Sequence, residues 1–168
     1  VILALKALAP LPQKKRIRWP WVWILAYPST LILLIGGWRA VRTPERPLFR
    51  PEEEVAVFQY LAHNAEKDAV VLSSRETGNP LPAWAPLQVV IGHGPETIYA
   101  EDVLPRVEAF YQTNASSQAR RALLAEFQVD YVFYGPLERA LGTWHPSQAE
   151  YLTPVYRAGD YAIFLVDD

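Results

Sequence analysis

An uncharged stretch near the start of the chain constrains its fold more than any other feature of the sequence. From Trp19 to Trp38 the chain reads WPWVWILAYPSTLILLIGGW, twenty residues without a charged side chain. A helix of that length measures about 30 Å, which is the thickness of the hydrocarbon core of a bilayer. Tryptophans stand at both ends, where the membrane interfaces favour aromatic rings. The stretch therefore predicts a transmembrane helix over residues 19–42, with a lipid bilayer as its partner.

Two other interpretations of this stretch stay open. A helix buried in a large soluble core would also lack charge, although a chain of 168 residues has little room for such a core. A signal peptide would also place a basic run such as KKRIR (residues 14–18) before an apolar run. Against the signal peptide, the apolar run is long and no small-residue cleavage site follows it cleanly.

The residues that flank this stretch bear on the topology of the protein. The chain contains no methionine, even at its first position, so we expect it to be a piece of a longer protein. Residues 1–18 fit the end of a preceding membrane helix and a short basic loop, which predicts a multi-pass protein of the plasma membrane. Basic residues flank the span on both sides, but the cluster before it is denser. By the positive-inside rule, we expect the domain after the span to lie outside the cytoplasm.

The remainder of the chain has the pattern of an α/β domain. Residues 43–51 hold three prolines and predict a stiff linker, so the domain covers residues 52–168. Short apolar runs at 69–74, 87–92 and 130–135 read as strands, and they alternate with helical patterns at 100–113 and 116–128. Residues 153–166 read as a hairpin that turns at 158–160. The pattern predicts a small, mostly parallel sheet with flanking helices and a C-terminal antiparallel hairpin at one edge.

The composition excludes several classes of function. A net charge of −2 and an isoelectric point near 5.9 argue against a nucleic-acid partner. The absence of cysteine excludes disulfides and thiolate metal sites, and the three histidines do not have metal-ligand spacing. No dinucleotide fingerprint, phosphate-binding loop or nucleophile elbow is present. The sequence therefore predicts no metal, no cofactor and no catalytic residue within this chain.

Polar side chains in three loops form a candidate binding site. Ligands of such sheets bind at the carboxyl ends of the strands, and loops at 76–80, 92–97 and 135–139 follow the three predicted strands. The polar rim that they would form consists of Glu76, Asn79, His93, Glu96, Thr97, Glu138 and Arg139. Each residue also has an ordinary structural explanation, because Gly, Asn and Pro are common in turns and charged side chains are common in the first turn of a helix.

The order of these segments resembles a known family. After the uncharged stretch and the proline-rich linker come VVLSSRETGNPLPAWA (70–85), VVIGHGPET (89–97), LLAEFQVDYVFYGPLERALG (123–142) and PVYRAGDYAIFLV (154–166). Nearly the whole chain resembles the C-terminal region of bacterial multi-pass membrane glycosyltransferases of the GT-C type, which are related to protein mannosyltransferases.

The resemblance implies a fold and a function. It implies a small extracytoplasmic α/β domain behind the last membrane helix, in a protein that transfers a sugar from a polyprenyl-phosphate donor to an acceptor. The catalytic acid of that family lies in the first extracytoplasmic loop, which this chain does not contain, so no catalytic residue carries over. We expect the domain to have an accessory or acceptor-binding role. The alternative is a non-enzymatic extracytoplasmic binding or interaction module of a membrane protein.

Overall fold

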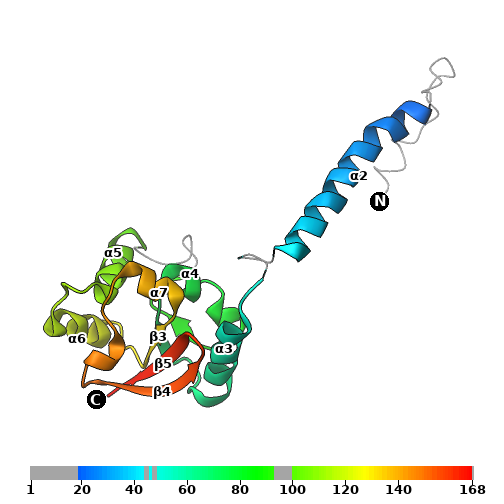
Figure 1. Cartoon of the computed structure of the whole chain (residues 1–168). Coiled ribbons are helices and arrows are strands. Elements are labelled where there is room, and N and C mark those ends of the chain that lie inside the picture. Colours follow the sequence, from blue (N-terminus) through cyan, green and yellow to red (C-terminus); the bar gives the residue numbers. More distant parts are fainter. Residues whose placement is uncertain (1–18, 44–45, 47–48, 93–99, 168) are drawn as a thin grey trace, which may run out of the picture. The chain divides into compact units, whose positions relative to one another are not determined.

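The computed structural model describes residues 19–43, 46, 49–92 and 100–167, and it divides the chain into two compact units. The first unit covers Val1–Phe49 and the second covers Arg50–Asp168 (Figure 1).

The described part of the first unit is dominated by one helix. α2 (Trp19–Arg42) is 24 residues long and has Pro28 in its interior. Its side chains are described from Tyr27 onward, and the large apolar ones of Leu31 to Ile35 are 52–75% exposed. Within the described residues, no helix combines the length and the apolar character that crossing a membrane requires. The predicted span is thus helical, while its place in a bilayer stays a prediction.

The second unit is built on one five-stranded sheet. Its strands are β1 (Val70–Leu72), β2 (Gln88–Val89), β3 (Tyr131–Tyr134), β4 (Leu152–Ala158) and β5 (Tyr161–Val166). Their spatial order is β2-β1-β3-β5-β4. The central strand β3 runs parallel to β1 and antiparallel to β5. The hairpin of β4 and β5 forms one edge, as the sequence predicted.

The prediction of a mostly parallel sheet is wrong. Two of the four strand pairings are parallel, but each of these joins only two residue pairs, whereas β5 pairs four residues with β3 and six with β4. The sheet is therefore mixed and mostly antiparallel. The parallel strand β1 is short because the chain enters a helix at Ser74, two residues after the strand ends.

Among its described residues, the second unit also contains five helices and two short 3₁₀ turns. They are α3 (Glu52–Asn64), α4 (Arg75–Gly78), η1 (Leu81–Ala83), α5 (Ala100–Tyr111), α6 (Ser117–Glu126), α7 (Pro136–Leu141) and η2 (Pro146–Gln148). The helices α5 and α6 confirm the helical patterns predicted at 100–113 and 116–128, and the side chain of Ser116 caps α6. The loop predicted at 76–80 begins instead as helix α4, because the side chain of Ser74 accepts a hydrogen bond from the backbone of Thr77.

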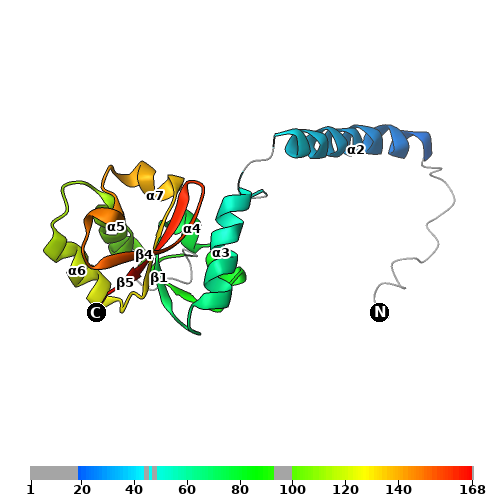
Figure 2. The ribbon, with the colours of Figure 1, turned by 60° about the horizontal axis from the view of Figure 1, so that its bottom comes forward.

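The helices cover the two faces of the sheet (Figures 1 and 2). On one face, Phe58 and Leu61 of α3 pack against the sheet residues Phe133 and Ile163. The residues that pack α5 and α6 against the other face are Phe110, Leu123, Val132 and Phe164. On this second face the segment that carries η2 lies against the hairpin, since the ring of His145 contacts the ring of Phe164.

Candidate functional site

The structure describes four of the seven residues of the predicted polar rim. Glu76 lies in α4 and Asn79 caps its end, and both side chains are exposed. Glu138 and Arg139 are neighbours in α7, where the first is buried and the second is exposed. The other three predicted residues, His93, Glu96 and Thr97, lie outside the described residues.

Glu138 joins the ends of two strands. Its side chain is 1% exposed. One carboxylate oxygen accepts a hydrogen bond from the backbone N–H of Ser74 at 2.9 Å, and the other accepts from the N–H of Gly135 at 3.0 Å. Ser74 follows β1 and Gly135 follows β3, so Glu138 satisfies backbone donors where the two parallel strands end. These contacts give Glu138 a structural role.

Tyr111 completes the closure of this edge. Its hydroxyl is buried and lies within hydrogen-bond distance of the carbonyl oxygens of Leu72, at 3.2 Å, and Phe133, at 3.0 Å. Burial raises the pKa of Tyr111 well above its ordinary value, and the nearby Glu138 carboxylate adds to the effect. The hydroxyl therefore stays protonated and bridges β1 and β3 from α5. In the described residues, the backbone groups at the carboxyl ends of β1 and β3 are therefore hydrogen-bonded to Glu138 and Tyr111.

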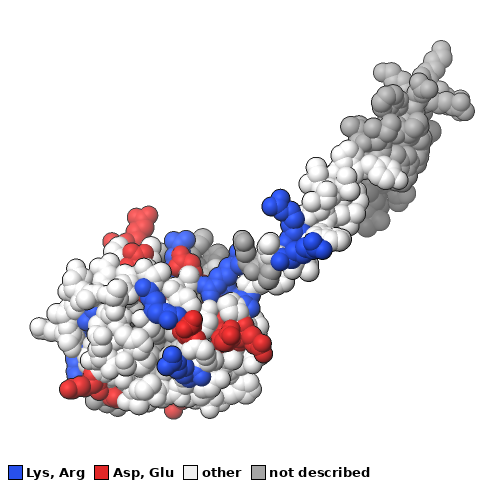
Figure 3. Space-filling model, in the orientation of Figure 1, with Lys and Arg blue, Asp and Glu red and all other residues white. Residues whose placement is uncertain are grey.

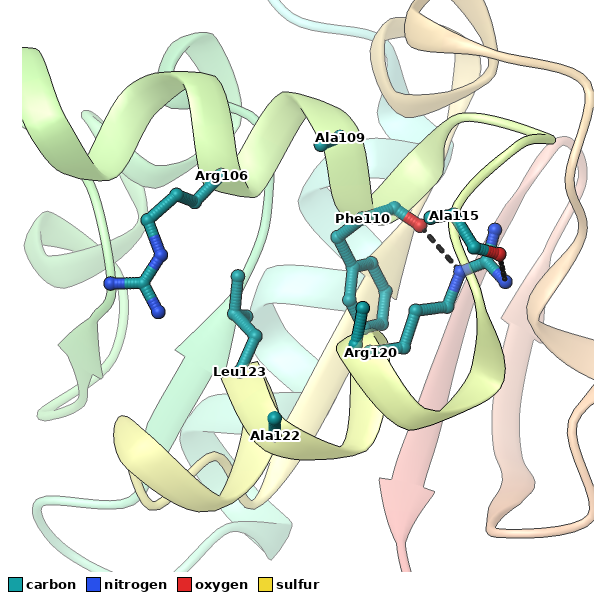
Figure 4. A pocket seen from close by; sticks show the side chains of 8 residues that line it. Arg106, Ala109, Phe110, Ala115, Arg120, Ala122 and Leu123 are labelled. Atoms are coloured by element: carbon teal, nitrogen blue, oxygen red, sulfur yellow. Dashed lines mark hydrogen bonds between the residues drawn. The ribbon is translucent and has the colours of Figure 1, made fainter.

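A first cavity, of about 320 Å³, lies between α5 and α6 (Figure 4). Four alanines and two arginines are among the residues that line it, and the small alanine side chains leave the space open. Arg106 forms an ion pair with Glu126 through both of its terminal nitrogens. Arg120 donates to three carbonyl oxygens of the residues Phe110, Gln112 and Ala115, near the end of α5. Since both cations already have partners, this cavity offers an apolar hollow without an available charged group.

A second cavity, of about 460 Å³, lies over the hairpin, and we name it the hairpin groove. Its lining residues are Tyr134, Arg139, His145, Ser147, Pro154, Val155, Tyr156, Arg157, Asp160, Ala162 and Phe164. They come from β3, α7, the start of η2 and both strands of the hairpin. The groove collects two arginines and a histidine, against one carboxylate. On the face shown in Figure 3, charges of both signs are interspersed over the second unit.

The register of the sheet explains the shape of the hairpin groove. Tyr134 of β3 pairs with Ala162 of β5, and Ala162 pairs in turn with Arg157 of β4. Residues that pair across strands project from the same face of a sheet, so these three side chains form one row. The small Ala162 at its centre leaves a hollow between the tyrosine and the arginine.

A β-bulge determines which face Arg157 occupies. The pairing of β4 with β5 shifts between Pro154 and Tyr156, so Val155 is an extra residue in the strand. Side chains alternate between the two faces along a regular strand, which would place Arg157 on the face opposite Pro154. The extra residue reverses this alternation and places Arg157 on the same face as Pro154.

His145 forms a wall of the hairpin groove. Its ring lies edge-on against Tyr134, with centroids 4.6 Å apart, and against Phe164 at 5.9 Å. Its Nδ1 accepts the backbone N–H of Ser147 at 3.1 Å, which leaves the proton of the neutral ring on Nε2. Burial lowers the pKa of His145 below its ordinary value, and the positive charges of Arg157 and Arg139 lower it further.

Within the part of the chain that the structure describes, each of the two arginines of the hairpin groove bonds to a single residue. Arg139 lies 3.4 Å from a carboxylate oxygen of Asp160, and the two side chains are 41% and 70% exposed. Such exposed pairs contribute little to stability. Arg157 donates from Nε to the carbonyl oxygen of Gly159 at 3.1 Å. Sequence reasoning identified Arg139 but missed His145 and Arg157, because nothing local to the sequence places these two residues beside it.

Comparisons with known proteins identify a similar fold. Neither the protein-family models nor the curated proteins contain a match to the chain. A solved structure that matches is the crystal structure of the C-terminal globular domain of an oligosaccharyltransferase from Archaeoglobus fulgidus. The match has a TM-score of 0.51 and 15% sequence identity, and it covers 71% of this chain and 100% of that domain. At this identity the likeness shows a shared fold, and it carries over no individual residue.

Proposed function

We propose that this chain is the C-terminal part of an integral-membrane glycosyltransferase of the GT-C type that uses a polyprenyl-phosphate sugar donor. Residues 52–168 would be its accessory or acceptor-binding domain. The observation that carries the proposal is the shared fold, because the match extends over the entire C-terminal globular domain of an oligosaccharyltransferase. The proposal includes the relation to bacterial protein mannosyltransferases that the sequence resemblance implies.

The segment before the domain supports the membrane part of the proposal. The uncharged stretch from Trp19 to Trp38 lies within the single helix α2, and its described apolar side chains are exposed. Exposed apolar side chains along a helix fit a lipid environment. In the proposed arrangement the protein is a multi-pass protein of the plasma membrane, with the domain on the extracytoplasmic side.

Sugar transfer by the full-length protein tests the proposal. The assay follows a radiolabelled sugar from a polyprenyl-phosphate donor to acceptors in a membrane extract. We expect transfer by the full-length protein, and a loss of most of it when the chain is ended after residue 49. Transfer that is unchanged by the truncation would exclude an essential role for the domain. Absence of transfer with every polyprenyl-phosphate sugar supplied would contradict the proposed activity.

One observation favours the alternative, a non-enzymatic binding or interaction module. The described part of the sheet's carboxyl edge is closed by Glu138 and Tyr111, which bond to the backbone. The sequence upstream of Val1 distinguishes the two functions. Further membrane helices with an acidic residue pair in the first outer loop favour the transferase, and a start codon directly before Val1 favours the module.

A further inference from the structure

We propose that the hairpin groove is a binding site for a phosphate group, held by Arg139, His145 and Arg157. The assignment goes beyond the proposed function, which names no surface of the domain and does not depend on this one. The three residues come from α7, from the residue that precedes η2, and from β4, and all three line one cavity of about 460 Å³. Three donors that reach one cavity from three elements are the arrangement that a tetrahedral oxyanion requires.

Arg157 supplies an available guanidinium. Within the described residues, no acidic side chain pairs with it, and its only hydrogen bond there runs from Nε to the carbonyl oxygen of Gly159. The two terminal nitrogens of this exposed residue therefore have no partner within the described residues. A guanidinium binds phosphate oxygens through two parallel hydrogen bonds, which lysine cannot do. The bulge at Val155 places this group over the groove and away from the face that α3 covers.

Arg139 supplies a second cation that can exchange its partner. Its contacts with Asp160 are 3.3–3.5 Å long, and both side chains are well exposed to water. A phosphate carries more negative charge than the single carboxylate of Asp160, and it presents more acceptor oxygens. The carboxylate of Asp160 also lines the groove and repels an anion, so its removal should strengthen binding.

His145 supplies a neutral donor. The N–H of Ser147 fixes the lone pair of the ring on Nδ1, so the proton on Nε2 is available for a ligand. Within the described residues, Nε2 has no hydrogen-bond partner. The neutral ring donates one hydrogen bond to an anion without adding a third positive charge that would repel the two arginines.

The shape of the groove favours a phosphate on a small organic group. The small side chain of Ala162 forms the floor between Tyr134 and Arg157. The rings of Tyr134, His145 and Phe164 form an aromatic wall beside it. Such a wall packs against the carbon skeleton of a bound ligand while the arginines hold its charge. The same phosphate chemistry can come from a lipid-linked phosphate or from a soluble sugar phosphate.

Titration calorimetry with the 168-residue chain in detergent micelles tests this assignment. One arm uses glucose 1-phosphate as a soluble probe, and the other uses a polyprenyl phosphate dissolved in the same micelles. Acetate at matched ionic strength is the comparison anion. NMR of the His145 ring nitrogens, recorded in parallel, locates the bound anion, because a ligand on Nε2–H shifts that nitrogen.

Matched variants connect the binding to the hairpin groove. Arg139→Gln and Arg157→Gln remove exposed charges without opening the core, and each should weaken phosphate binding about tenfold. Asp160→Asn should strengthen binding several-fold. Ala162→Leu should abolish binding by filling the hollow. Lys67→Gln removes one exposed positive charge just before the first residue of β1, outside the residues that line the groove, and should leave the affinity for phosphate unchanged.

Saturable phosphate binding that follows this order of variants supports the assignment, and the probe that binds more tightly identifies the source of the phosphate. The assignment is overturned if neither probe binds, or if the double variant Arg139→Gln/Arg157→Gln binds as the unmodified chain does. Equal affinity for acetate overturns it as well and makes the groove a carboxylate site. None of these results depends on sugar transfer, so this assignment and the proposed function can fail separately.

Discussion

The backbone N–H of Ser74 donates a 2.9 Å hydrogen bond to the buried carboxylate of Glu138, 64 residues away in the sequence. The second oxygen of the same carboxylate accepts the N–H of Gly135. A single side chain thus connects the ends of β1 and β3 at the edge where α/β proteins bind ligands. The effect of removing it measures how much of this edge serves stability.

Glu138→Gln should destabilise the second unit by about 3 kcal/mol. The amide of glutamine replaces one acceptor oxygen by an NH₂ group, which then faces a buried backbone N–H that has lost its partner. We expect the Tm, followed by near-UV circular dichroism, to fall by roughly 10 °C. Glu76→Gln, at an exposed position of α4, is the matched control and should change stability by less than about 0.5 kcal/mol. Equal Tm values for the two variants would disprove the structural role.

Tyr111→Phe should destabilise the fold at neutral pH by about 1 kcal/mol, because it removes the hydroxyl shared by two strand carbonyls. The effect should shrink at alkaline pH. Burial raises the pKa of Tyr111, so the folded chain keeps a proton that the unfolded chain loses above about pH 10. The unmodified chain therefore loses stability as the pH rises through 10, and the variant lacks this contribution. Tm values of the unmodified chain and the variant at pH 8 and pH 10.5 test this prediction. A difference in Tm that is the same at both pH values would contradict it.

Gly78→Ala should cost about 3 kcal/mol. A Cβ atom at this position would lie 2.0 Å from the carbonyl oxygen of Ile91, and a backbone oxygen cannot move aside as a flexible side chain can. Gly37→Ala is the control, because a Cβ on this residue of α2 would meet no atom within 4 Å. Thermal unfolding of both variants checks the prediction. A Gly78→Ala chain as stable as the control would show that α4 does not pack closely on the exit of β2.

His145→Asn should reduce the loss of folding stability that the unmodified chain shows below about pH 6.5. The folded chain resists protonation of His145, whose pKa is lowered by burial and by Arg157 and Arg139, whereas the unfolded chain takes up a proton near pH 6.5. Stability therefore falls as the pH drops below 6.5. Asparagine keeps an acceptor for the N–H of Ser147 but does not titrate.

Tm measurements at pH 7.5 and pH 5 test this expectation. The difference in stability between the unmodified chain and the variant should be smaller at pH 5. Besides the two arginines, Tyr134, Ser147 and Asp160 line the same groove, and none of them changes in the variant. If the difference is the same at both pH values, His145 is not held neutral by its surroundings.

Local signals in the sequence predicted most helices and strands. Pro51 and the acidic residues after it mark the start of α3, Ser116 marks the start of α6, and glycine at 159 marks the turn of the hairpin, where φ is +55°. These signals work because the residues that decide the conformation lie within one turn of each other.

The features that depend on distant contacts could not be predicted in this way. Glu138 reads as a solvated residue in the first turn of a helix, and only its position against Ser74 makes it a buried acceptor. Regular alternation along the strand would place Arg157 on the face opposite Pro154. The bulge that moves it to the same face as Pro154 is seen only in the pairing of β4 with β5. The hairpin groove therefore became visible only with the register of the sheet.

The most direct test of the proposed membrane protein is the sidedness of its two ends. These 168 residues contain no cysteine, and any cysteine elsewhere in the full-length protein is first replaced by serine, so that each introduced cysteine is the single reactive one. Glu150→Cys lies at an exposed position of the second unit, and Lys15→Cys lies in the basic run before Trp19. Intact cells that produce the full-length protein are treated with a membrane-impermeant maleimide, before and after permeabilisation. We expect the cysteine at position 150 to react in intact cells and the cysteine at position 15 to react only after permeabilisation. Equal labelling of both positions in intact cells, or labelling of position 15 alone, would contradict a membrane span with an outward-facing domain.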